Sequence, residues 1–445
     1  MVFNSFGFLF LFFPIFFLAF RWLPRRWCPW ALILGSLVFY AVGARRALWQ
    51  VALLIAMTAL GVAGCRALSA RGRDRRMLAL WVGVTAAPLA FVKLAGLVLA
   101  EPPALPLGLS FYTFQLIAFL VYAWKGGQTT PLGVAAGTLM FPKLVSGPIG
   151  EAGAILETVR APRRNKARLD AGLEMFILGL AAKAVVADHL AGVLGQIRTW
   201  GVGAVSVPMA WIGVAGYALQ LYFDFWGYSL MAVGAARMLG MLLPDNFNHP
   251  YCAVSIAEFW RRWHITLGQW FKTHVYIPLG GSRNGTGRMV LATLAVWVLT
   301  GVWHGAGWNY LLWGLVMFAL IMGERLVYGR ALEKLPALGH VYVPLAVALS
   351  WVFFITPNPA GAGAYFRRLF GGSGAAGDPQ DWLKALRWCW PYLALGGLFS
   401  TPLPGKLWRK ISGTGAAWAL LFALFWVSVY FLATAASDPF LYFSF

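Results

Sequence analysis

The sequence predicts an all-α, polytopic membrane protein with roughly ten to twelve transmembrane helices, supplemented by re-entrant or interfacial helices. Hydrophobic residues make up 60% of the 445 residues and charged residues only 11%, against about 25% charged residues in a soluble domain. The mean hydropathy is +0.69. We find no internal repeat and no long linker, so we expect one integral-membrane domain over residues 1–445.

Apolar runs of about 18 residues, the length that crosses a bilayer as a helix, recur along the whole chain. They fall at residues 3–20, 29–43, 47–64, 77–100, 107–124, 172–187, 203–236, 289–323, 341–356, 385–400 and 416–436. The runs 203–236 and 289–323 are each long enough to fold as a broken pair of helices. Residues 133–150 are also apolar, but Pro142 and Pro148 interrupt them, which favours a short helix or a re-entrant segment over a full span.

The basic residues lie where a membrane protein carries them. The formal net charge is +21, from 36 Lys and Arg against 15 Asp and Glu. These side chains cluster in short loops between apolar runs, which matches the positive-inside rule and argues against nucleic-acid binding. Five arginines in residues 66–76 and three in residues 21–27 follow odd-numbered runs, so we expect the N-terminus outside the cytoplasm. Arg45 and Arg46, after the second run, weakly oppose this orientation.

Residues 255–274, SIAEFWRRWHITLGQWFKTH, gather charged and aromatic side chains in an otherwise apolar chain. On a helical wheel, Arg262 and Lys272 share one arc with other polar residues, and the aromatic residues, Trp263 among them, occupy the opposite arc. We therefore expect one amphipathic helix at the membrane boundary, with its cationic face toward water or phosphate. His264 lies at the edge of the aromatic arc and is predicted to face the interior.

The run 289–323 contains no Asp, Glu, Lys or Arg, and its one ionisable side chain of near-neutral pKa is His304. Gly301, Gly305 and Gly307 weaken a continuous helix there and permit close backbone approach. A polar residue on such a break at membrane depth is a candidate functional residue. A neutral histidine hydrogen-bonded between helices is the structural alternative. Histidine suits proton transfer because its unperturbed pKa of about 6.5 lets it accept and return a proton near neutral pH.

Five stretches carry a resemblance to a known family. They are PLGLSFYTFQ (106–115), FPKLVSGPI (141–149), LYFDFWGYS (221–229), FWRRWHITL with its extension YIPLGGSR (259–267 and 276–283), and LTGVWHGAGWNYLLWG (299–314). In this order, and with the C-terminal PFLYFSF, they resemble the membrane-bound O-acyltransferases, and within them the bacterial branch typified by the alginate O-acetylation protein. The resemblance covers nearly the whole chain. It implies a multi-helix enzyme around a funnel through which an acyl group passes across the membrane.

The resemblance also implies roles for two histidines. His304 matches the near-invariant histidine of the family, and His264 matches a second polar position, which is His, Asn or Asp in various branches. We expect His304 to act as the base, and His264 to orient it or to polarise the donor carbonyl. The chain departs from the branch at Leu230 and Tyr122, where relatives commonly carry a carboxylate.

Six further residues are candidates for substrate binding: Trp303, Asn309, Asp224, Trp263, Arg262 and Lys272. Arg262 and Lys272 could attract donor phosphates, although contact with anionic lipid explains them equally well. Asn309 could orient His304 or bind substrate. Asp224 sits in an apolar run, where a carboxylate is costly unless paired, so it is either a structural partner of an Arg or a backbone N–H, or an active-site group.

The cysteines argue against a metal site, a disulfide framework and a cysteine nucleophile. The four are far apart and lack CxxC spacing, which argues against a zinc site or a disulfide framework, and we expect no metal. Cys252 is a rival nucleophile, but its sequence neighbours offer no paired base.

We therefore expect a multi-pass O-acyltransferase of the bacterial inner membrane. It would move acetyl from a cytoplasmic thioester donor such as acetyl-CoA, with no bound cofactor, to a hydroxyl on, or on the way to, an exported polysaccharide such as alginate. The resemblance implies a separate periplasmic partner, an acetyltransferase or esterase-like protein. Alternative acceptors are peptidoglycan, teichoic acid or a carrier protein. A transporter is the alternative from another class, because transporters also break helices around polar groups at membrane depth.

Overall fold

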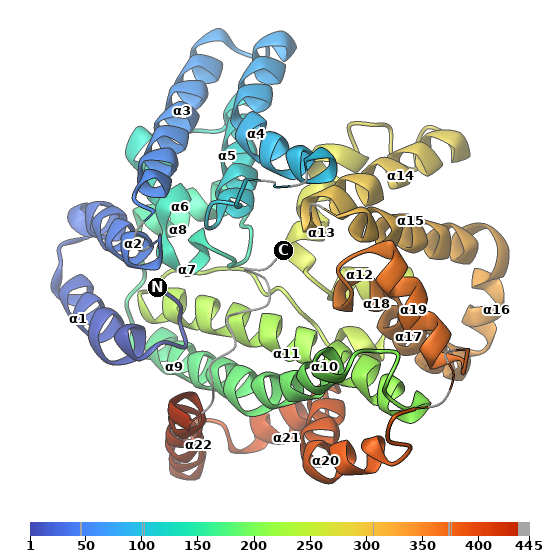
Figure 1. Ribbon diagram of the computed structural model, residues 1–445. Coiled ribbons are helices and arrows are strands. Elements are labelled where there is room, and N and C mark those ends of the chain that lie inside the picture. Colours follow the sequence, from blue (N-terminus) through green and yellow to red (C-terminus); the bar gives the residue numbers. More distant parts are fainter. Residues whose placement is uncertain are drawn as a thin grey trace. The chain divides into compact units, whose positions relative to one another are not determined.

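In the computed structural model, the elements of regular secondary structure in the described part of the chain are helices (Figure 1). The described residues are 1–44, 47–99, 101, 103–305, 307–372, 374 and 376–434. They contain no strand beyond one isolated antiparallel bridge, between Phe247 and Trp263. The all-α prediction is thus confirmed for these residues. Arg45, Arg46 and the C-terminal PFLYFSF lie outside them.

The chain forms two compact units that are interleaved in sequence. The first comprises Met1–Leu180 and Tyr228–Asp245, and the second comprises Ala181–Gly227 and Asn246–Phe445. Two of the boundaries fall inside helical segments, so the backbone passes between the units without a linker there. The expectation of a single integral-membrane domain stays a prediction.

The first unit consists of long apolar helices and several short ones. They are α1 (Phe13–Trp22), α2 (Cys28–Ala44), α3 (Trp49–Arg71), α4 (Arg75–Val98), α5 (Leu109–Trp124), α6 (Pro131–Leu139), α7 (Phe141–Leu144), α8 (Ala152–Arg160) and α9 (Lys166–Ala181), with the π-helix Gly7–Phe12 and the 3-10 turn Arg25–Trp27 before α1 and α2. Helices α3, α4 and α5 lie side by side (Figure 1). Gly61 of α3 permits this, because a Cβ there would stand 2.4 Å from the Leu116 side chain of α5.

The apolar residues 133–150 fold as the prolines predict. Helix α6 ends at Leu139, and α7 begins at Phe141 with Pro142 in its first turn, where the missing proline N–H costs no hydrogen bond. The segment after α7 is buried up to Gly150. The short-helix prediction is confirmed.

The second unit contains the segments that carry both candidate histidines. It is built from α10 (Asp188–Trp200), α11 (Val207–Met238, whose end belongs to the first unit), α12 (Ile256–Arg262), α13 (Ile265–Phe271), α14 (Gly285–His304), α15 (Trp308–Gly323), α16 (Gly329–Lys334), α17 (Pro336–Ser350), α18 (Val352–Ile355), α19 (Pro359–Leu369), α20 (Asp381–Phe399), α21 (Leu403–Ile411) and α22 (Gly415–Thr434). The π-helices Ala182–Ala187, Lys272–Tyr276 and Glu324–Tyr328 and the 3-10 turn Pro250–Cys252 connect some of them.

The two longest apolar runs fold differently. Residues 289–323 form a broken pair, because α14 ends at His304 and α15 begins at Trp308. Gly301 lets the two helices pack closely, since a Cβ there would stand 2.7 Å from the carbonyl oxygen of Tyr310. The run 203–236, by contrast, does not break: from Val207 onward it lies within the continuous helix α11.

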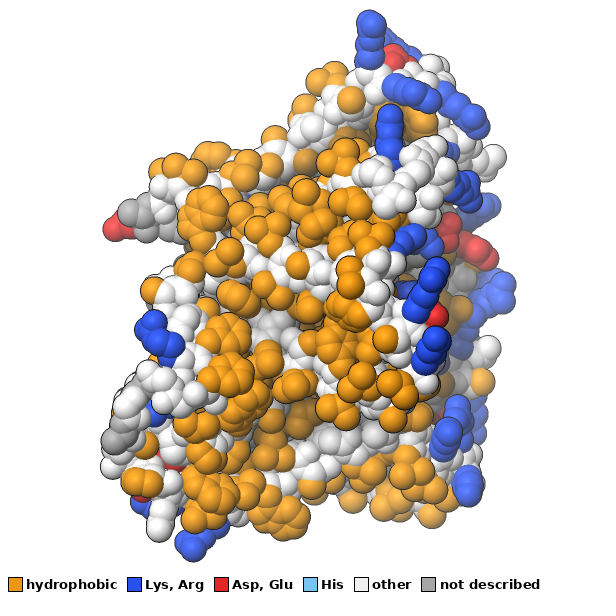
Figure 2. Space-filling view, turned by 90° about the vertical axis from the view of Figure 1, so that its right-hand side faces the viewer, with side chains coloured by type: hydrophobic (Ala, Val, Ile, Leu, Met, Phe, Trp, Pro, Cys, Tyr) orange, Lys and Arg blue, Asp and Glu red, His pale blue; other side chains and the backbone are white. Residues whose placement is uncertain are grey.

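The helices are apolar and long enough for a multi-pass membrane protein. Eight helices of the described residues reach the length and hydropathy of a membrane span, and Gly7–Trp22 and Leu109–Trp124 are shorter apolar helices. Large hydrophobic side chains are exposed on them, such as Val98 at 83% and Phe422 at 67%. Figure 2 shows many such hydrophobic side chains on the surface, with lysine and arginine side chains gathered apart from them. A surface of this kind is stable in lipid and not in water.

Candidate active site

The segment around His264 is not the single amphipathic helix that the wheel predicts. Helix α12 ends at Arg262, Trp263 is extended, and α13 begins at Ile265. His264 itself is in the left-handed region, with φ 44° and ψ 52°. It is one of two non-glycine residues with positive φ in the described part of the chain, the other being His249. Such backbone strain costs about 1–3 kcal/mol and persists only where the surroundings enforce it.

Residues 246–248 hold the His264 backbone in this conformation. The N–H of Ile265 donates to the carbonyl oxygen of Asn246 at 3.0 Å, and the N–H of Asn248 donates to that of Arg262 at 2.9 Å. Phe247 and Trp263 form the antiparallel bridge between these bonds. Backbone hydrogen bonds with residues 246–248, which lie earlier in the sequence, therefore hold the break between α12 and α13.

The turn directs the His264 side chain into the protein. The residue is 3% exposed, which confirms the predicted inward orientation. Its Nδ1 lies 3.0 Å from Oδ1 of Asn246, and its ring meets Phe225 edge-on at 4.7 Å between centroids. Burial lowers the pKa of His264 to about 3, because an imidazolium loses its hydration there. The side chain is therefore neutral at physiological pH.

His304 stands at the end of α14, beside the break, and is 7% exposed. Aromatic rings surround it: centroid distances are 4.5 Å to Trp303, 5.0 Å to Trp313 and 5.2 Å to Phe354. The ring of Trp303 also lies 6.1 Å from that of His264. One indole thus contacts both histidines, so the structure brings His264, His304 and Trp303 into one aromatic cluster of the second unit.

Trp263 extends this cluster on the other side of the turn. It is 3% exposed and lies 5.5 Å from Phe259 in a stacked arrangement and 5.4 Å from Trp351. Trp351 in turn stacks on Trp313, which contacts His304. Aromatic rings thus pack continuously from Trp263 through Trp351 and Trp313 to His304.

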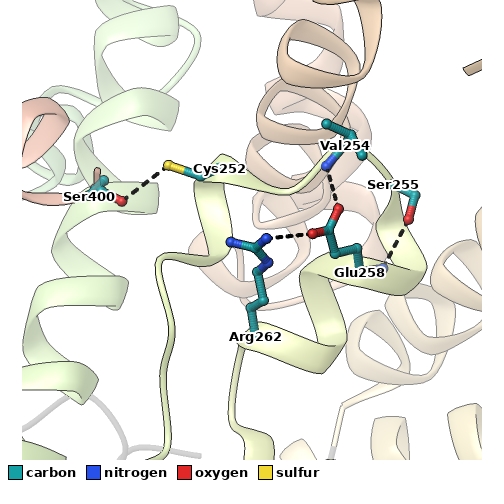
Figure 3. Close-up of polar contacts among 6 residues, drawn as sticks. All are labelled: Cys252, Val254, Ser255, Glu258, Arg262 and Ser400. Atoms are coloured by element: carbon teal, nitrogen blue, oxygen red, sulfur yellow. Dashed lines mark hydrogen bonds and ion pairs between the residues drawn. The ribbon is translucent and has the colours of Figure 1, made fainter. Parts of the chain in front are cut away.

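Helix α12 is anchored at its N-terminus by acidic and hydroxyl side chains. Glu324 accepts hydrogen bonds from the N–H groups of Ile256 at 2.5 Å and Ala257 at 3.1 Å. Ser255 caps the same turn by accepting from the N–H of Glu258 at 3.0 Å (Figure 3). These contacts satisfy N–H groups that a helix leaves unpaired, and carboxylates there also interact favourably with the helix dipole.

Arg262 and Lys272, predicted to share a cationic face, have separate surroundings. Arg262 forms an ion pair with Glu258 at 2.5 Å, one turn back on α12 (Figure 3). Burial tends to raise the pKa of Glu258, but the Val254 N–H and the Arg262 guanidinium hold it below its usual range. Lys272 begins a π-helix after the break and is exposed. Glu258 thus partly neutralises the Arg262 guanidinium.

Asp224 is a member of a buried ion cluster. Lys183 Nζ lies 2.7 Å from a carboxylate oxygen of Asp224 and 2.6 Å from one of Asp188, and all three side chains are at most 10% exposed. We call these three residues the Lys183 cluster. The partner of Asp224 is therefore a lysine, whereas the sequence analysis predicted an arginine or a backbone N–H. The geometry favours the structural interpretation of Asp224.

Asn309 is the second residue of α15 and ties this helix to α18. Its amide nitrogen donates to the carbonyl oxygens of Phe353 at 2.7 Å and Thr356 at 3.0 Å. These two bonds account for both amide hydrogens. Its roles toward His304 or substrate stay predictions.

Sequence reasoning missed Asn246 and Glu324, which position the His264 segment. Neither has a spacing signal, because both contacts join residues far apart in sequence. The available hint is compositional: Asn246 lies near the start of a comparatively polar stretch, residues 244–288, and Glu324 is a carboxylate directly after a run of 35 residues without charge.

Comparisons with known proteins show the family of this chain. The model of the MBOAT family, membrane-bound O-acyltransferases, matches residues 104–361, which include all five motif stretches and both histidines. The probable alginate O-acetylase AlgI of Azotobacter vinelandii is 33% identical over 392 residues, 80% of this chain and 76% of the relative. That of Pseudomonas putida is 30% identical over 506 aligned positions that cover both chains entirely. The peptidoglycan O-acetyltransferase of Helicobacter pylori is 32% identical over 296 residues, 57% of this chain and 54% of the relative.

The helices, the buried histidines and these matches define a multi-pass membrane O-acyltransferase. The chain belongs to the MBOAT family. The transporter alternative is thereby set aside, because the family transfers acyl groups.

Proposed function

We propose that this enzyme transfers acetyl from a cytoplasmic thioester donor, acetyl-CoA, across the bacterial inner membrane for O-acetylation of an exported polysaccharide such as alginate. The names of the relatives from Azotobacter vinelandii and Pseudomonas putida support the polymer class. The observation that carries the chemistry is the single indole of Trp303 in contact with both buried histidines. Two imidazoles in one dry aromatic cluster suit a reaction that must exclude water.

The reaction needs a base for the hydroxyl proton and a site in which water does not compete as the acceptor. His304 takes the role of base in this proposal, with His264 as the second polar group. Trp303, Trp313 and Phe354 exclude water around His304. Lys272 is exposed and able to meet donor phosphates or lipid head groups.

A cysteine nucleophile fits less well. The Cys252 thiol donates to the carbonyl oxygen of Ser400 at 3.6 Å (Figure 3). Burial raises the pKa of Cys252, although Arg262 opposes the shift, so the thiol stays protonated. A protonated thiol that is already bound to a carbonyl is a poor nucleophile.

The acyl acceptor and the partner follow from the same proposal. The polymer is acetylated outside the inner membrane, so a periplasmic acetyltransferase or esterase-like protein receives the acetyl group. Peptidoglycan is the second candidate acceptor, because the Helicobacter pylori relative is named for it.

The test is acetyl transfer by purified protein in lipid nanodiscs, supplied with radiolabelled acetyl-CoA and either alginate or peptidoglycan fragments. We expect labelled ester on the polysaccharide when the periplasmic partner is present. His304→Ala should retain the fold and lower transfer by at least about 100-fold. His340→Ala, at an exposed histidine of α17, is the matched control and should remain active. Full activity of the His304→Ala protein would disprove the role of His304, and label on peptidoglycan alone would change the acceptor.

A further inference from the structure

Asn246 touches three consecutive residues at the turn that carries His264. Its carbonyl oxygen accepts from the N–H of Ile265 at 3.0 Å. Its side-chain oxygen Oδ1 accepts from the Thr266 N–H at 3.3 Å and from the Thr266 hydroxyl at 2.9 Å, and it lies 3.0 Å from Nδ1 of His264. Asn246 is 2% exposed, so water does not compete for these contacts.

The Thr266 backbone decides which end of the Asn246 amide faces the turn. A backbone N–H can only donate, so the atom that receives it must be the amide oxygen and not the NH₂ group. The same oxygen faces Nδ1 of His264. An oxygen without a hydrogen can only accept, and Nδ1 must therefore carry the proton of the imidazole.

We propose that Asn246 is a positioning residue that fixes His264 as the Nδ1–H tautomer, so that Nε2 acts as a hydrogen-bond acceptor in the acyl-transfer site. A neutral imidazole has one N–H, and the buried His264 is neutral. With that hydrogen on Nδ1, Nε2 holds the lone pair. Whatever meets Nε2 during the reaction must donate a hydrogen, as a substrate hydroxyl or an imidazole N–H does.

This assignment separates two roles that the sequence leaves open. Polarising the carbonyl of the acyl donor requires a hydrogen on the group that faces it, which the Nδ1–H tautomer lacks at Nε2. Orienting His304, or accepting a hydrogen bond from the hydroxyl that attacks the acyl donor, requires the lone pair that this tautomer supplies. The strained backbone of His264 aims the ring, and Asn246 sets its proton. The inference about the reaction rests on the proposed function, whereas the tautomer itself does not.

The tautomer can be measured directly. The full-length protein, labelled with ¹⁵N-histidine and held in lipid nanodiscs, gives separate nitrogen signals for Nδ1–H and Nε2–H imidazole in solid-state NMR. Six histidines contribute, and the His264 signals are those that disappear in His264→Gln. We expect the neutral Nδ1–H form at pH 7. An Nε2–H form or an imidazolium would overturn the proposal.

Three variants distinguish positioning from simple structural support. Asn246→Leu removes the acceptor and should shift His264 toward Nε2–H, with kcat at least about 10-fold lower and the donor KM nearly unchanged. Asn246→Asp keeps an oxygen acceptor and should keep Nδ1–H. Thr266→Val removes another hydrogen bond to the same oxygen and should leave both tautomer and kcat as they are.

The experiments test the proposal even if one of the variants does not fold. An unchanged tautomer in Asn246→Leu, or equal losses of kcat in Asn246→Leu and Thr266→Val, would show that Asn246 only stabilises the turn. If Asn246→Leu does not fold, the wild-type and Asn246→Asp spectra still decide the tautomer. If His264→Gln retains full transfer while the wild type shows Nδ1–H, the proposed role of His264 fails and the assignment of the tautomer stands.

Discussion

Substitutions in the Lys183 cluster should have very unequal effects on stability. The cluster combines one ammonium with two carboxylates, a net charge of −1. Asp224→Asn leaves Lys183 and Asp188 paired at 2.6 Å and brings the charge to zero. Lys183→Met leaves two carboxylates buried without their cation and brings the charge to −2. Removing one partner of a buried ion pair costs about 3–5 kcal/mol, whereas exchanging a carboxylate for an amide that still accepts a hydrogen bond costs about 1 kcal/mol.

The free cysteines provide the assay. Cys28, Cys65 and Cys389 are buried, so a thiol-reactive fluorescent dye reports unfolding on heating. With the first two changed to Ala, the dye reports mainly the second unit, which carries the cluster. In a unit of this size, each kcal/mol shifts the melting temperature by about 2–4 °C. We expect Lys183→Met to lower it by about 6–20 °C and Asp224→Asn by about 2–4 °C.

The exposed pair of Lys384 and Asp378 is a matched control. Its ions are also 2.6 Å apart, but their side chains are 67% and 43% exposed. Lys384→Met should therefore leave the melting temperature almost unchanged, because solvent screens this pair. Equal shifts for Asp224→Asn and Lys183→Met would refute the charge argument. Loss of acyl transfer in Asp224→Asn at an unchanged melting temperature would place Asp224 in the reaction instead.

Two further substitutions test how the His264 segment is held. Glu324→Gln keeps one acceptor oxygen but turns an NH₂ group toward the N-terminus of α12, so we expect it to lower the stability by about 1–3 kcal/mol in the same melting assay. Glu333→Gln, at an exposed residue, is the control. Identical melting temperatures of the two variants would contradict the anchoring of α12 by Glu324. His264→Gly relieves the left-handed strain that His264→Ala retains, so the glycine variant should be more stable than the alanine variant by about 1 kcal/mol. If the His264→Ala and His264→Gly variants melt at the same temperature, the positive φ of His264 is not costly.

The break at His304 could be predicted because its signals are local. Gly305 and Gly307 stand directly after the histidine, and glycine both weakens a helix and tolerates close packing. The structure ends α14 at His304 for this reason and packs Gly301 against α15. The multi-pass helical fold was predictable on the same terms, since hydropathy acts residue by residue along the chain.

The turn at His264 could not be predicted, because its cause is distant in sequence. Locally, residues 255–274 alternate as an amphipathic helix does, and nothing among them requires positive φ. The left-handed residue is imposed by hydrogen bonds from residues 246–248, which a helical wheel does not represent. The wheel predicted the burial of His264 correctly but for the wrong reason, since the turn and not the aromatic arc directs the side chain inward.

The turn also changes what the basic residues of this segment can do together. On one continuous helix, Arg262 and Lys272 would present a single cationic face to a phosphate. The break places them on separate helical segments, and Arg262 is already paired with Glu258 on its own helix. In the proposed reaction, a donor phosphate would compete with that carboxylate for the guanidinium, so we expect Lys272 to contribute more than Arg262 to any attraction of the donor. The arginine serves the site by holding α12 together, and α12 leads directly into the strained turn that carries the histidine.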